Sequence, residues 1–561
     1  MQEVIVSNTA RDSRLNVESL KRGSQRLPLI LRQLGFSSMR KGQDEAVANL
    51  MGCRDVLGIF PTAQGKSGMF GIPTLCLEWK TLVFSPLVSL MRDQVQGWQR
   101  KGVAAAQMSS TQSEAENQMA ARLWMAGELN LFYVAPERLQ NDFFKSAIQA
   151  QRPDMVVVDE AHVISNWSDN FRPSYCAVGD FIAEYNPQVV FACTATAPPE
   201  VEHDIRRVLG LQNARKLLYY PRRTNLDLRS RDWSSDAEFA GFVREAVERG
   251  PSIIYCATIK KVCDVAKMLE DYVKEDVTIF HGDLTPEMKR VNQDLFMSDR
   301  SPLVVATNAF GMGVDKPNIR TVLHYDIPGS LEALSQEVGR AGRDGLPSQC
   351  WTFFSKRAVQ TQQRFIDGAY PPAQEIRKLF NGIKALVNGQ NICHVTPEQL
   401  AKAGGMRLWY FDSAMGILIA AGVVDRPKAE EKNCFIKFVG DTTDARFQSY
   451  KDAIESGGVY SPSGFWEVDV YWIADTVQTS YQTVTKYLKQ WAKDGFLEYV
   501  PPLRNKPIRL LGDICQVEFE RLVRKAEFAY QKLADVIKYC ELPDSEKHAF
   551  IEAYFGIPPN Q

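Results

Sequence analysis

The sequence predicts an α/β protein with two parallel-sheet domains in tandem, followed by helical and winged-helix modules. Between Leu29 and about Leu211 short apolar runs alternate with amphipathic stretches, and this alternation begins again at Ser252. Short, continuously apolar runs are typical of buried parallel strands, and the stretches between them of crossover helices. After about Lys356 the rhythm stops and helix–turn–helix patterns replace it.

The apolar runs define the expected strands and, with them, the domains. In the first domain we expect strands at 55–60, 81–84, 131–134, 155–158 and 189–192, and in the second at 252–255, 277–280, 303–306 and 321–324. The stretch 220–229 suits a linker. The expected segments are a flexible N-terminal extension at 1–27, α/β domains at 28–215 and 216–358, a helical region at 359–450, a winged-helix-like domain at 451–512 and a helical hairpin at 513–561.

The region after the two α/β domains contains two helix–turn–helix patterns. The first covers 396–424, and the second covers 468–499 and is followed by apolar stretches at 496–500 and 508–511. Helix–turn–helix with a returning hairpin is a winged-helix pattern. Arg504 and Lys506 at the hairpin tip suit contact with duplex DNA, and a packing module for protein partners fits the pattern equally well.

Composition excludes several classes of protein. The chain has 66 Lys plus Arg against 67 Asp plus Glu, so any affinity for nucleic acid must come from local patches. The 11 cysteines are scattered without a C-x-x-C pair, which favours a reducing compartment over a disulfide scaffold. No apolar run reaches membrane-spanning length, and the polar N-terminus is not a secretory signal. We expect a cytoplasmic protein without membrane contact, associated with the nucleoid if its source is bacterial or phage.

The segment Pro61–Ser67 has the features of a phosphate-binding loop. It follows an apolar strand and precedes a helical stretch, and its residues are Pro-Thr-Ala-Gln-Gly-Lys-Ser. Backbone N–H groups of such a loop, here around Thr62 and Gly65, bind phosphate oxygens, Lys66 reaches the β- and γ-phosphates, and Ser67 helps to hold Mg²⁺. Gly-Lys-Ser alone is a weak signal, because it occurs by chance in surface loops.

A second motif, which is acidic, strengthens this interpretation. Asp159 and Glu160 directly follow the apolar run at 155–158. Asp159 is placed to anchor Mg²⁺, and Glu160 to orient the attacking water. An acidic helix cap would explain this motif alone, but not its occurrence after the phosphate-loop motif in one α/β domain.

The second α/β domain contributes two arginines to the predicted site. Arg340 and Arg343 occur in Gly-Arg-Ala-Gly-Arg, three residues apart, and we expect them on one face of a helix. The planar guanidinium fork suits the stabilisation of charge on phosphoryl oxygens. An Arg-rich surface turn is the plainer alternative, and it leaves the repeated Gly-Arg unexplained.

Together these motifs resemble the ordered motifs of superfamily 2 helicases, in particular of the RecQ family. The resemblance covers roughly residues 29–355 and implies RecA-like motor domains that bind ATP and Mg²⁺. It implies that ATP is also bound by Phe36, Arg40, Gln43, Gly313 and Asp315, and that DNA is contacted by Ser85, Arg138 and Thr307. The segment 194–197 resembles the motif that links hydrolysis to domain movement.

The stretch 163–175 resembles the aromatic-rich loop that distinguishes RecQ-like enzymes. Trp167 and Phe171 suit stacking on unpaired bases, and Arg172 suits contact with phosphate. Burial of the two aromatic rings in a core is the alternative, but Ser, Asn and Asp surround them. DNA, single-stranded and duplex, is implied as the partner by the resemblance alone.

The sequence departs from the RecQ pattern in two places. Only Cys393 lies between 355 and 395, so the family's four-cysteine zinc site cannot form there and no zinc is expected. The stretches 533–541 and 551–556 resemble helices around that zinc site, but they follow the winged-helix region. In the phosphate loop, Ala63 and Gln64 replace the usual glycines, so we expect ATP binding with slow turnover.

The leading functional hypothesis is an ATP-dependent DNA helicase that translocates 3′ to 5′, in DNA repair or recombination, with protein partners at its C-terminal region. An alternative is a nucleic-acid-stimulated ATPase that remodels protein–DNA or RNA complexes without net unwinding. A third is a DNA-binding regulator with inactive motor domains, against which the intact Lys66, Asp159, Glu160, Arg340 and Arg343 argue.

Overall fold

The computed structural model describes most of the chain and divides it into two compact units. The described residues are 15–60, 65–86, 88–165, 173–195, 197–219, 223–273, 276–310, 316–387, 391–393, 395–426, 433–461, 464–501 and 507–557. One unit comprises Met1–Gln362 together with Gln531–Gln561, and the other comprises Gln363–Tyr530. None of the helices in this described part of the chain has the length and apolar character needed to cross a membrane.

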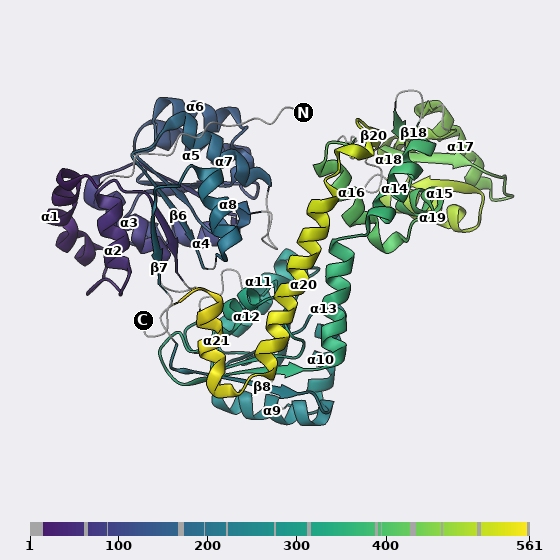
Figure 1. The fold of residues 1–561 in the computed structure, drawn as a ribbon. Helices are drawn as coiled ribbons and strands as arrows, with labels where there is room; N and C mark the ends of the chain where they lie inside the picture. Colours follow the sequence, from purple (N-terminus) through teal and green to yellow (C-terminus); the bar gives the residue numbers. More distant parts are fainter. Residues whose placement is uncertain are drawn as a thin grey trace. The chain divides into compact units, whose positions relative to one another are not determined.

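The first α/β domain is built on a seven-stranded parallel sheet (Figure 1) in the order β3-β4-β2-β5-β6-β1-β7. Its strands are β1 (Val56–Ile59), β2 (Thr81–Phe84), β3 (Ala105–Met108), β4 (Leu131–Val134), β5 (Met155–Val158), β6 (Val189–Thr194) and β7 (Arg215–Leu218). The α-helices are α1 (Val17–Gln33), α2 (Gln43–Met51), α3 (Lys66–Leu77), α4 (Val88–Arg100), α5 (Glu114–Met125), α6 (Asp142–Ala150), α7 (Cys176–Tyr185) and α8 (Pro199–Leu209). Short 3₁₀ turns lie at Pro136–Arg138, Ala161–Ile164 and Pro173–Tyr175.

Both faces of this sheet are covered, which explains why its central strands are continuously apolar. Along β5, Val156 and Val158 belong to a core shared with α5 to α8, whereas Met155 and Val157 belong to a core shared with α1 to α4. A strand buried on both sides has no polar face to alternate with. The sequence pattern therefore located these strands correctly.

The second α/β domain has a six-stranded parallel sheet in the order β10-β11-β9-β12-β13-β8. Its strands are β8 (Leu226–Asp232), β9 (Ser252–Tyr255), β10 (Val277–Phe280), β11 (Leu303–Ala306), β12 (Thr321–His324) and β13 (Ser348–Phe354). The helices are α9 (Asp236–Arg249), α10 (Ile259–Glu270), α11 (Pro286–Met297), α12 (Leu331–Val338) and α13 (Lys356–Ala369). Together the two sheets confirm the predicted fold class.

The structure corrects the predicted limits of the first domain and of the linker. Helix α1 starts at Val17, inside the expected flexible extension, because Leu20 and Leu27 pack against the core under α2 and α3. Strand β7 pairs with β1 and extends the first sheet beyond residue 215. The last four residues of the expected linker, 226–229, begin strand β8, which pairs with β13 along its full length.

The C-terminal segment of the chain packs against the second α/β domain. It comprises the end of α20 (Phe519–Glu541), a 3₁₀ turn at Asp544–Glu546 and α21 (Lys547–Tyr554). The fully buried Lys547 donates hydrogen bonds to Ser230 Oγ on β8 (2.6 Å) and to two carbonyls of its own segment, and His548 Nε2 lies 2.9 Å from the carbonyl oxygen of Leu226. Lys532 on α20 forms a buried ion pair with Glu332 on α12 at 3.3 Å. These contacts make the last helices part of the second α/β domain.

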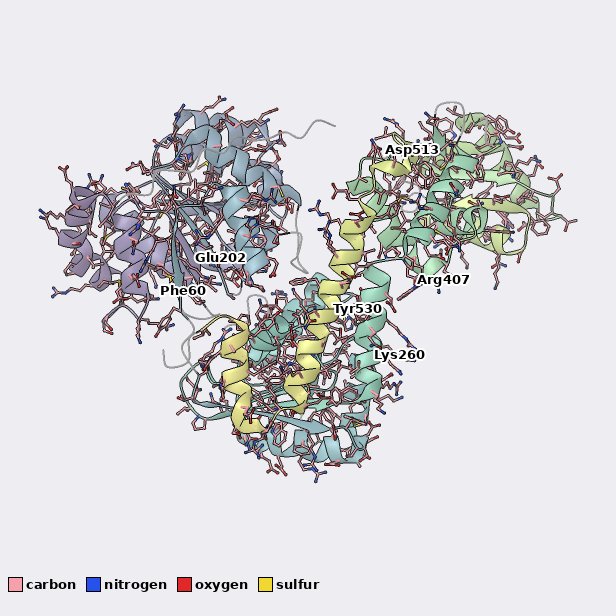
Figure 2. The ribbon with its side chains drawn as sticks, viewed as in Figure 1. Phe60, Glu202, Lys260, Arg407, Asp513 and Tyr530 are labelled. Atoms are coloured by element: carbon pink, nitrogen blue, oxygen red, sulfur yellow. The ribbon has the colours of Figure 1, made fainter. Side chains whose placement is uncertain are left out.

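The second unit begins with a small winged-helix module. Its helices are α14 (Ala373–Leu386), α15 (Pro397–Gly404) and α16 (Phe411–Ala420), with 3₁₀ turns at Leu408–Tyr410 and Ile514–Gln516. Its three-stranded antiparallel sheet has the order β14-β20-β15, from Ile392–Cys393, Ile508–Leu510 and Val424–Asp425. Arg407 between α15 and the following turn (Figure 2) donates its backbone N–H to Glu375 Oε2 of α14 at 2.9 Å, which ties the helices together.

A second module is inserted between β15 and β20. It comprises β16 (Asn433–Phe438), α17 (Ala445–Gly457), β17 (Val459–Tyr460), β18 (Trp466–Asp469), α18 (Val470–Thr476), α19 (Tyr481–Lys493) and β19 (Leu497–Val500). Its antiparallel sheet has the order β17-β18-β16-β19. The predicted hairpin between 496–500 and 508–511 is wrong, because β19 pairs with β16 and β20 pairs with β14 and β15 in the other sheet. Arg504 and Lys506 lie outside the described residues.

Candidate active site

Strand order in the first sheet brings the phosphate-loop and acidic motifs to the same edge. Strand β6 lies between β1 and β5, and all three are parallel, so their carboxyl ends are neighbours. Phe60 follows β1 (Figure 2) and donates its N–H to the carbonyl of Thr194 at the end of β6, at 2.9 Å. Asp159 follows β5. Residues about a hundred positions apart in the sequence therefore meet at this edge.

Lys66 and Glu160 form a partly buried ion pair at the centre of this edge. Lys66 is the first residue of α3, and its Nζ lies 3.3 Å from Glu160 Oε1. Burial alone would lower the pKa of Lys66, but the charges of Glu160 and Asp159 outweigh it and raise that pKa above its usual value. Burial opposes ionisation of Glu160, yet Lys66 lowers the pKa of Glu160 to about 2. Both groups are charged at neutral pH.

Asp159 has the environment of a metal-ligand carboxylate. Its side chain is buried and, through burial and the charge of Glu160, its pKa is raised. Cys193 Sγ donates a hydrogen bond to Asp159 Oδ1 at 3.4 Å. Ser67 lies in the first turn of α3, next to Lys66. In the described part of the chain no group of three or more His, Cys, Asp or Glu side chains is placed to hold a metal ion.

Glu160 is held in an unfavourable backbone conformation and is linked to β6 through a histidine. Its φ is 49°, in the left-handed region that costs a non-glycine residue on the order of 1–3 kcal/mol and that occurs often at functional sites. His162 Nδ1 lies 3.4 Å from Glu160 Oε2 and 2.8 Å from Thr194 Oγ1. The carboxylate is therefore connected through His162 to the start of segment 194–197.

The predicted adenine-reading residues lie beside the phosphate loop. Gln43 is the first residue of α2, and its Nε2 donates to the carbonyl of Gly65 at 3.3 Å, while its Oε1 accepts from the N–H of Arg40 at 2.8 Å. Gly65 has φ 69°, and a Cβ there would stand 2.7 Å from Gln43 Nε2, so glycine is needed. Lys101 lies over the ring of Phe36, 4.4 Å from its centroid. The structure thus places Gln43 and Gly65, both of which the resemblance assigns to ATP, in contact with each other.

Two predicted DNA contacts of the first domain also follow strands. Ser85 directly follows β2 and is buried. Arg138 lies in the 3₁₀ turn after β4, and its Nη2 donates to the carbonyl of Ser109, beyond β3, at 2.8 Å. Because β3, β4 and β2 are adjacent and parallel, these residues share the carboxyl edge of the sheet with Lys66 and Glu160.

In the second domain Arg340 and Arg343 follow α12 and are not on a helix. Helix α12 ends at Val338, and the next residues form consecutive turns, so the expected common helical face is wrong. The glycines of the Gly-Arg repeat end the helix. Arg340 is buried near Tyr255, at the carboxyl end of β9; burial raises the pKa of Tyr255 to about 12, and the charge of Arg340 opposes that rise.

Polar side chains hold the turns that carry Arg340 and Arg343 through hydrogen bonds to their backbone carbonyls. Arg223 Nη2 donates to the carbonyls of Ala341 (2.7 Å) and Gly342 (2.6 Å), and Asn225 Nδ2 donates to that of Gly342 at 2.8 Å. Gly342 has φ 55°, and a Cβ would stand 2.5 Å from Asn225 Nδ2. The turns that carry Arg340 and Arg343 are therefore held in one geometry.

Thr307 lies at the same edge of the second sheet as Arg340. It directly follows β11, is buried, and donates its N–H to the carbonyl of Phe280 on β10 at 3.1 Å. The remaining predicted site residues, Thr62, Trp167, Phe171, Arg172, Gly313 and Asp315, lie outside the described residues.

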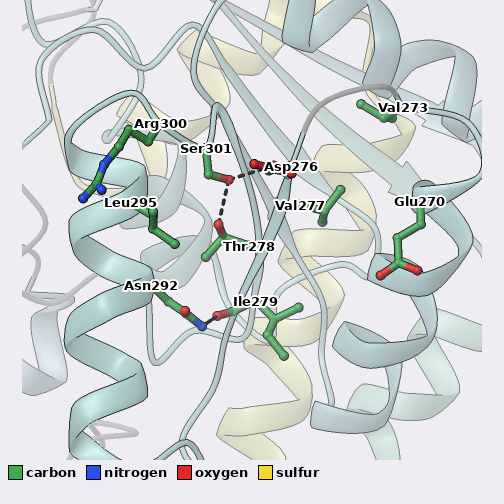
Figure 3. Close-up of a pocket in the computed structure, with 10 residues that line it drawn as sticks. All are labelled: Glu270, Val273, Asp276, Val277, Thr278, Ile279, Asn292, Leu295, Arg300 and Ser301. Carbon is green, nitrogen blue, oxygen red and sulfur yellow. Dashed lines mark hydrogen bonds between the residues drawn. The ribbon is translucent and has the colours of Figure 1, made fainter.

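A cavity of about 580 Å³ in the second domain lies away from these residues (Figure 3). It is at the amino end of β10, whereas Thr307 and Arg340 follow carboxyl ends. Three of its polar side chains are already hydrogen-bonded: Thr278 Oγ1 donates to Ser301 Oγ at 2.6 Å, and Asn292 Nδ2 donates to the carbonyl of Ile279 at 2.8 Å.

Sequence reasoning missed two members of the site. Neither Cys193 nor His162 was assigned to the site from the sequence, but the structure places both against the acidic pair. Strand order is the signal that finds Cys193: Ala192 pairs with Val158, so the residues after them, Cys193 and Asp159, are neighbours. That order was not available from the sequence pattern.

Comparison with known protein families agrees with this geometry. Residues 40–205 match the DEAD/DEAH box helicase family, and residues 238–345 match the helicase conserved C-terminal domain. The two matched regions coincide with the two parallel-sheet domains.

The chain is also similar to individual helicases. The chain is 36% identical over 370 residues to the ATP-dependent DNA helicase RecQ of Bacillus subtilis (strain 168), which is 65% of this chain and 61% of that protein. It is 34% identical over 345 residues to the "Probable ATP-dependent DNA helicase RecS" of the same organism, covering 61% of this chain and 69% of the relative. The crystal structure of the DUF1998 helicase MrfA bound to DNA superposes with a TM-score of 0.50 at 16% identity, covering 63% of this chain and 51% of that one.

Proposed function

The chain belongs to the RecQ-like helicases of superfamily 2, and we propose that it is an ATP-dependent DNA helicase that translocates 3′ to 5′ on single-stranded DNA and unwinds duplexes. The match covers 61% of the Bacillus RecQ protein, so the activity of the whole relative enters here as a proposal. The observation that supports it most directly is the partly buried cluster of Lys66, Glu160, His162 and Thr194 at the carboxyl edge of the first sheet.

We assign the binding of ATP to the groups around this cluster. Gln43 contacts the base, and Lys66 and the N–H groups at the start of α3 bind the phosphates. Asp159 and Ser67 fit Mg²⁺, which prefers oxygen ligands, and the bound ion would neutralise charge on the phosphates. The raised pKa of Asp159 is that of a buried carboxylate with too little compensating positive charge, which supports this assignment.

Glu160 is suited to orient the attacking water. The low pKa of Glu160 keeps its carboxylate ionised, so it accepts a hydrogen bond from water and aims that water at the γ-phosphate. Without ATP, Glu160 is engaged by Lys66, and binding of the phosphates draws Lys66 away from it. His162 then transmits the state of Glu160 to Thr194 and to the segment that follows β6. Hydrolysis is thus coupled to a segment outside the nucleotide site.

Arg340 and Arg343 supply positive charge from the second domain in this proposal. The planar guanidinium stabilises developing charge on phosphoryl oxygens, and the fixed turns that carry the arginines limit the entropy lost in reaching ATP. We assign single-stranded DNA to Ser85, Arg138 and Thr307, together with Trp167, Phe171 and Arg172. We place this activity in the cytoplasm, associated with the nucleoid if the source is bacterial or phage.

The test combines ATP hydrolysis with strand displacement. Purified full-length protein is assayed for ATP hydrolysis with and without single-stranded DNA, as wild type, Glu160→Gln and the control Glu184→Gln on the exposed face of α7. We expect DNA to stimulate hydrolysis, Glu160→Gln to lower kcat by about 10²–10⁴-fold, and the control to behave as wild type. Duplexes with 3′ or 5′ overhangs then report direction.

Two results would contradict the proposal. Absence of DNA-stimulated hydrolysis by the wild type would remove the motor function altogether. Strong stimulation without displacement of either duplex would favour the alternative, an ATPase that remodels complexes without net unwinding.

A further inference from the structure

Helix α12 carries the turns in which Arg340 and Arg343 lie. The helix ends at Val338, and the N–H of Arg340 donates to the carbonyl of Glu337 in its last turn at 3.2 Å. The N–H of Ala341 donates to the carbonyl of Val338 at 3.1 Å. These bonds join the turns to the helix, so a displacement of α12 would also displace the arginines. The position of both guanidinium groups therefore depends on what holds α12.

The end of α12 nearest the arginines is fixed to the sheet of its own domain. Glu337 Oε2 lies 2.8 Å from Nε2 of His324, the last residue of β12, and both side chains are buried. In the turns that follow the helix, Gly342 donates its N–H to the carbonyl of Ile319, just before β12, at 2.8 Å. These contacts anchor one end of α12.

The beginning of α12 is held by a residue from the C-terminal segment of the chain. Glu332 lies in the first turn of α12, and Lys532 Nζ lies 3.3 Å from its Oε1. Only 6% of the Lys532 side chain and 12% of the Glu332 side chain are exposed. A pair this deeply buried is screened by salt much less than an exposed one. The ion pair therefore attaches the start of α12 to α20.

Helix α20 brings a negative charge to the same place. Asp535, one turn beyond Lys532, has a pKa that burial raises, that a hydrogen bond from Gln531 lowers, and that the charge of Glu332 raises further. The carboxylates of Asp535 and Glu332 thus repel each other across this contact, and the ammonium group of Lys532 offsets that repulsion. Without this lysine, we expect the start of α12 to move away from α20.

Lys532 also lies next to the boundary between the two compact units. Helix α20 begins at Phe519 in the second unit, and the first unit takes up the chain again at Gln531. The docking of α20 on the second α/β domain therefore reaches α12 through one of the first side chains of α20 in that unit.

We propose that Lys532 is a positioning residue for ATP hydrolysis, which acts through Glu332 and α12 to set the place of Arg340 and Arg343. The inference rests on the proposed function, which assigns both arginines to ATP. Lys532 itself touches neither nucleotide nor DNA in this proposal. The C-terminal helices then influence the rate of hydrolysis through the start of α12, while the sheet holds its other end.

The first measurement is steady-state ATP hydrolysis by the full-length protein with saturating single-stranded DNA. Wild type is compared with Lys532→Met, with the double charge reversal Lys532→Glu, Glu332→Lys, and with the control Lys538→Met, which removes an exposed lysine from the same helix. Misplacement of a reacting group by about 1 Å costs on the order of 10²-fold in rate, so we expect Lys532→Met to lower kcat by about 10- to 100-fold.

The KM for ATP separates positioning from a general loss of structure. The groups assigned to the base and to the phosphates lie in the first domain, so the KM of Lys532→Met should stay within about twofold of wild type. The double reversal keeps the attraction between the two side chains and should recover most of the lost kcat. The control should behave as wild type.

The second measurement reports the arginine-bearing turns without nucleotide or DNA. Hydrogen exchange is followed by mass spectrometry in the peptide that covers 339–345, where the amides of Arg340, Ala341 and Gly342 are hydrogen-bonded. Exchange of such amides follows local opening, and we expect it to be about tenfold faster in Lys532→Met. Exchange in Lys538→Met should match wild type.

Either an unchanged kcat or unchanged exchange in Lys532→Met would overturn the proposal. Equal losses in Lys538→Met would also overturn it, and so would a double reversal no more active than Lys532→Met, since Lys532 would then not act through Glu332. If the wild type shows no DNA-stimulated hydrolysis, the proposed function fails, while the exchange comparison still decides whether Lys532 holds the turns.

Discussion

Lys547→Met tests whether a single buried cation holds the C-terminal helices on the second α/β domain. The ammonium group donates to Ser230 Oγ, to the carbonyl of Tyr539 at 2.8 Å and to that of Leu542 at 2.9 Å. Methionine has a similar length and keeps the apolar stem, but it has no donor. The substitution therefore removes the polar contacts and little of the packing.

The free-energy cost of Lys547→Met follows from the backbone carbonyls that lose their hydrogen-bond donor. Tyr539 and Leu542 would retain carbonyls without their donor, and a buried polar group that loses its partner costs about 1–3 kcal/mol. Relief of the burial that lowers the pKa of Lys547 offsets part of this cost. Asp544 Oδ1 lies 3.8 Å from the ammonium group, but this carboxylate is half exposed, so its charge stays solvated when the cation is removed. We expect a net loss of about 2–4 kcal/mol in the docking of residues 531–557.

Native-state proteolysis measures this loss directly. When local opening is fast, cleavage follows the population of the open state, and about 1.4 kcal/mol corresponds to a tenfold change. Cleavage within 531–557 should accelerate by about 30- to 1000-fold in Lys547→Met. The control Lys538→Met removes an exposed lysine from the same segment and should cleave like wild type. Equal cleavage of wild type and Lys547→Met would refute the view that this lysine anchors the helices.

Three further predictions concern the nucleotide site and the core. Gln43→Ala removes the bond to the phosphate loop, so the KM for ATP should rise about tenfold in a steady-state assay, corresponding to about 1.4 kcal/mol; an unchanged KM would contradict the role. Thr194→Val breaks the 2.8 Å bond to His162 and should reduce strand displacement more than ATP hydrolysis, and equal reductions would argue against coupling through this pair. Burial raises the pKa of the Cys350 thiol to about 12, while the unfolded thiol ionises near about 8.5, so above that pH the unfolded state loses its proton first and stability falls as pH rises. Urea unfolding at pH 7.5 and 9.5 should show Cys350→Ala retaining about 1.4 kcal/mol that the wild type loses, and the same pH dependence in both would contradict this.

Strands buried on both faces were predictable from the sequence, whereas edge strands were not. The run at 155–158 has no polar residue because a helix layer covers each side of β5. Strand β7 lies at the edge of the first sheet, and its first residues, Arg215 and Lys216, are exposed. A strand with charged residues and one neighbour produces no apolar run, and no strand was therefore predicted there.

The candidate site also contains residues that the sequence predicted and residues that it did not. Lys66, Asp159 and Glu160 were found because each follows an apolar strand in a motif with fixed spacing. His162 and Cys193 were not recognised, because their roles depend on β6 lying beside β5. The neighbours of a parallel strand are set by crossover connections, and local periodicity does not record them.

The insertion of one module into another explains why the predicted hairpin failed and how the second unit is built. Val424 pairs with Leu510 and Asp425 with Arg509, so the chain leaves and re-enters the first module at two adjacent points. Those points are where a short hairpin loop would close β15 onto β20, and the second module occupies the place of that loop. Closing a longer loop costs little additional entropy, since each doubling of its length adds only about 0.6 kcal/mol. A whole domain is therefore tolerated at this position without disturbing the core around α14, α15 and α16.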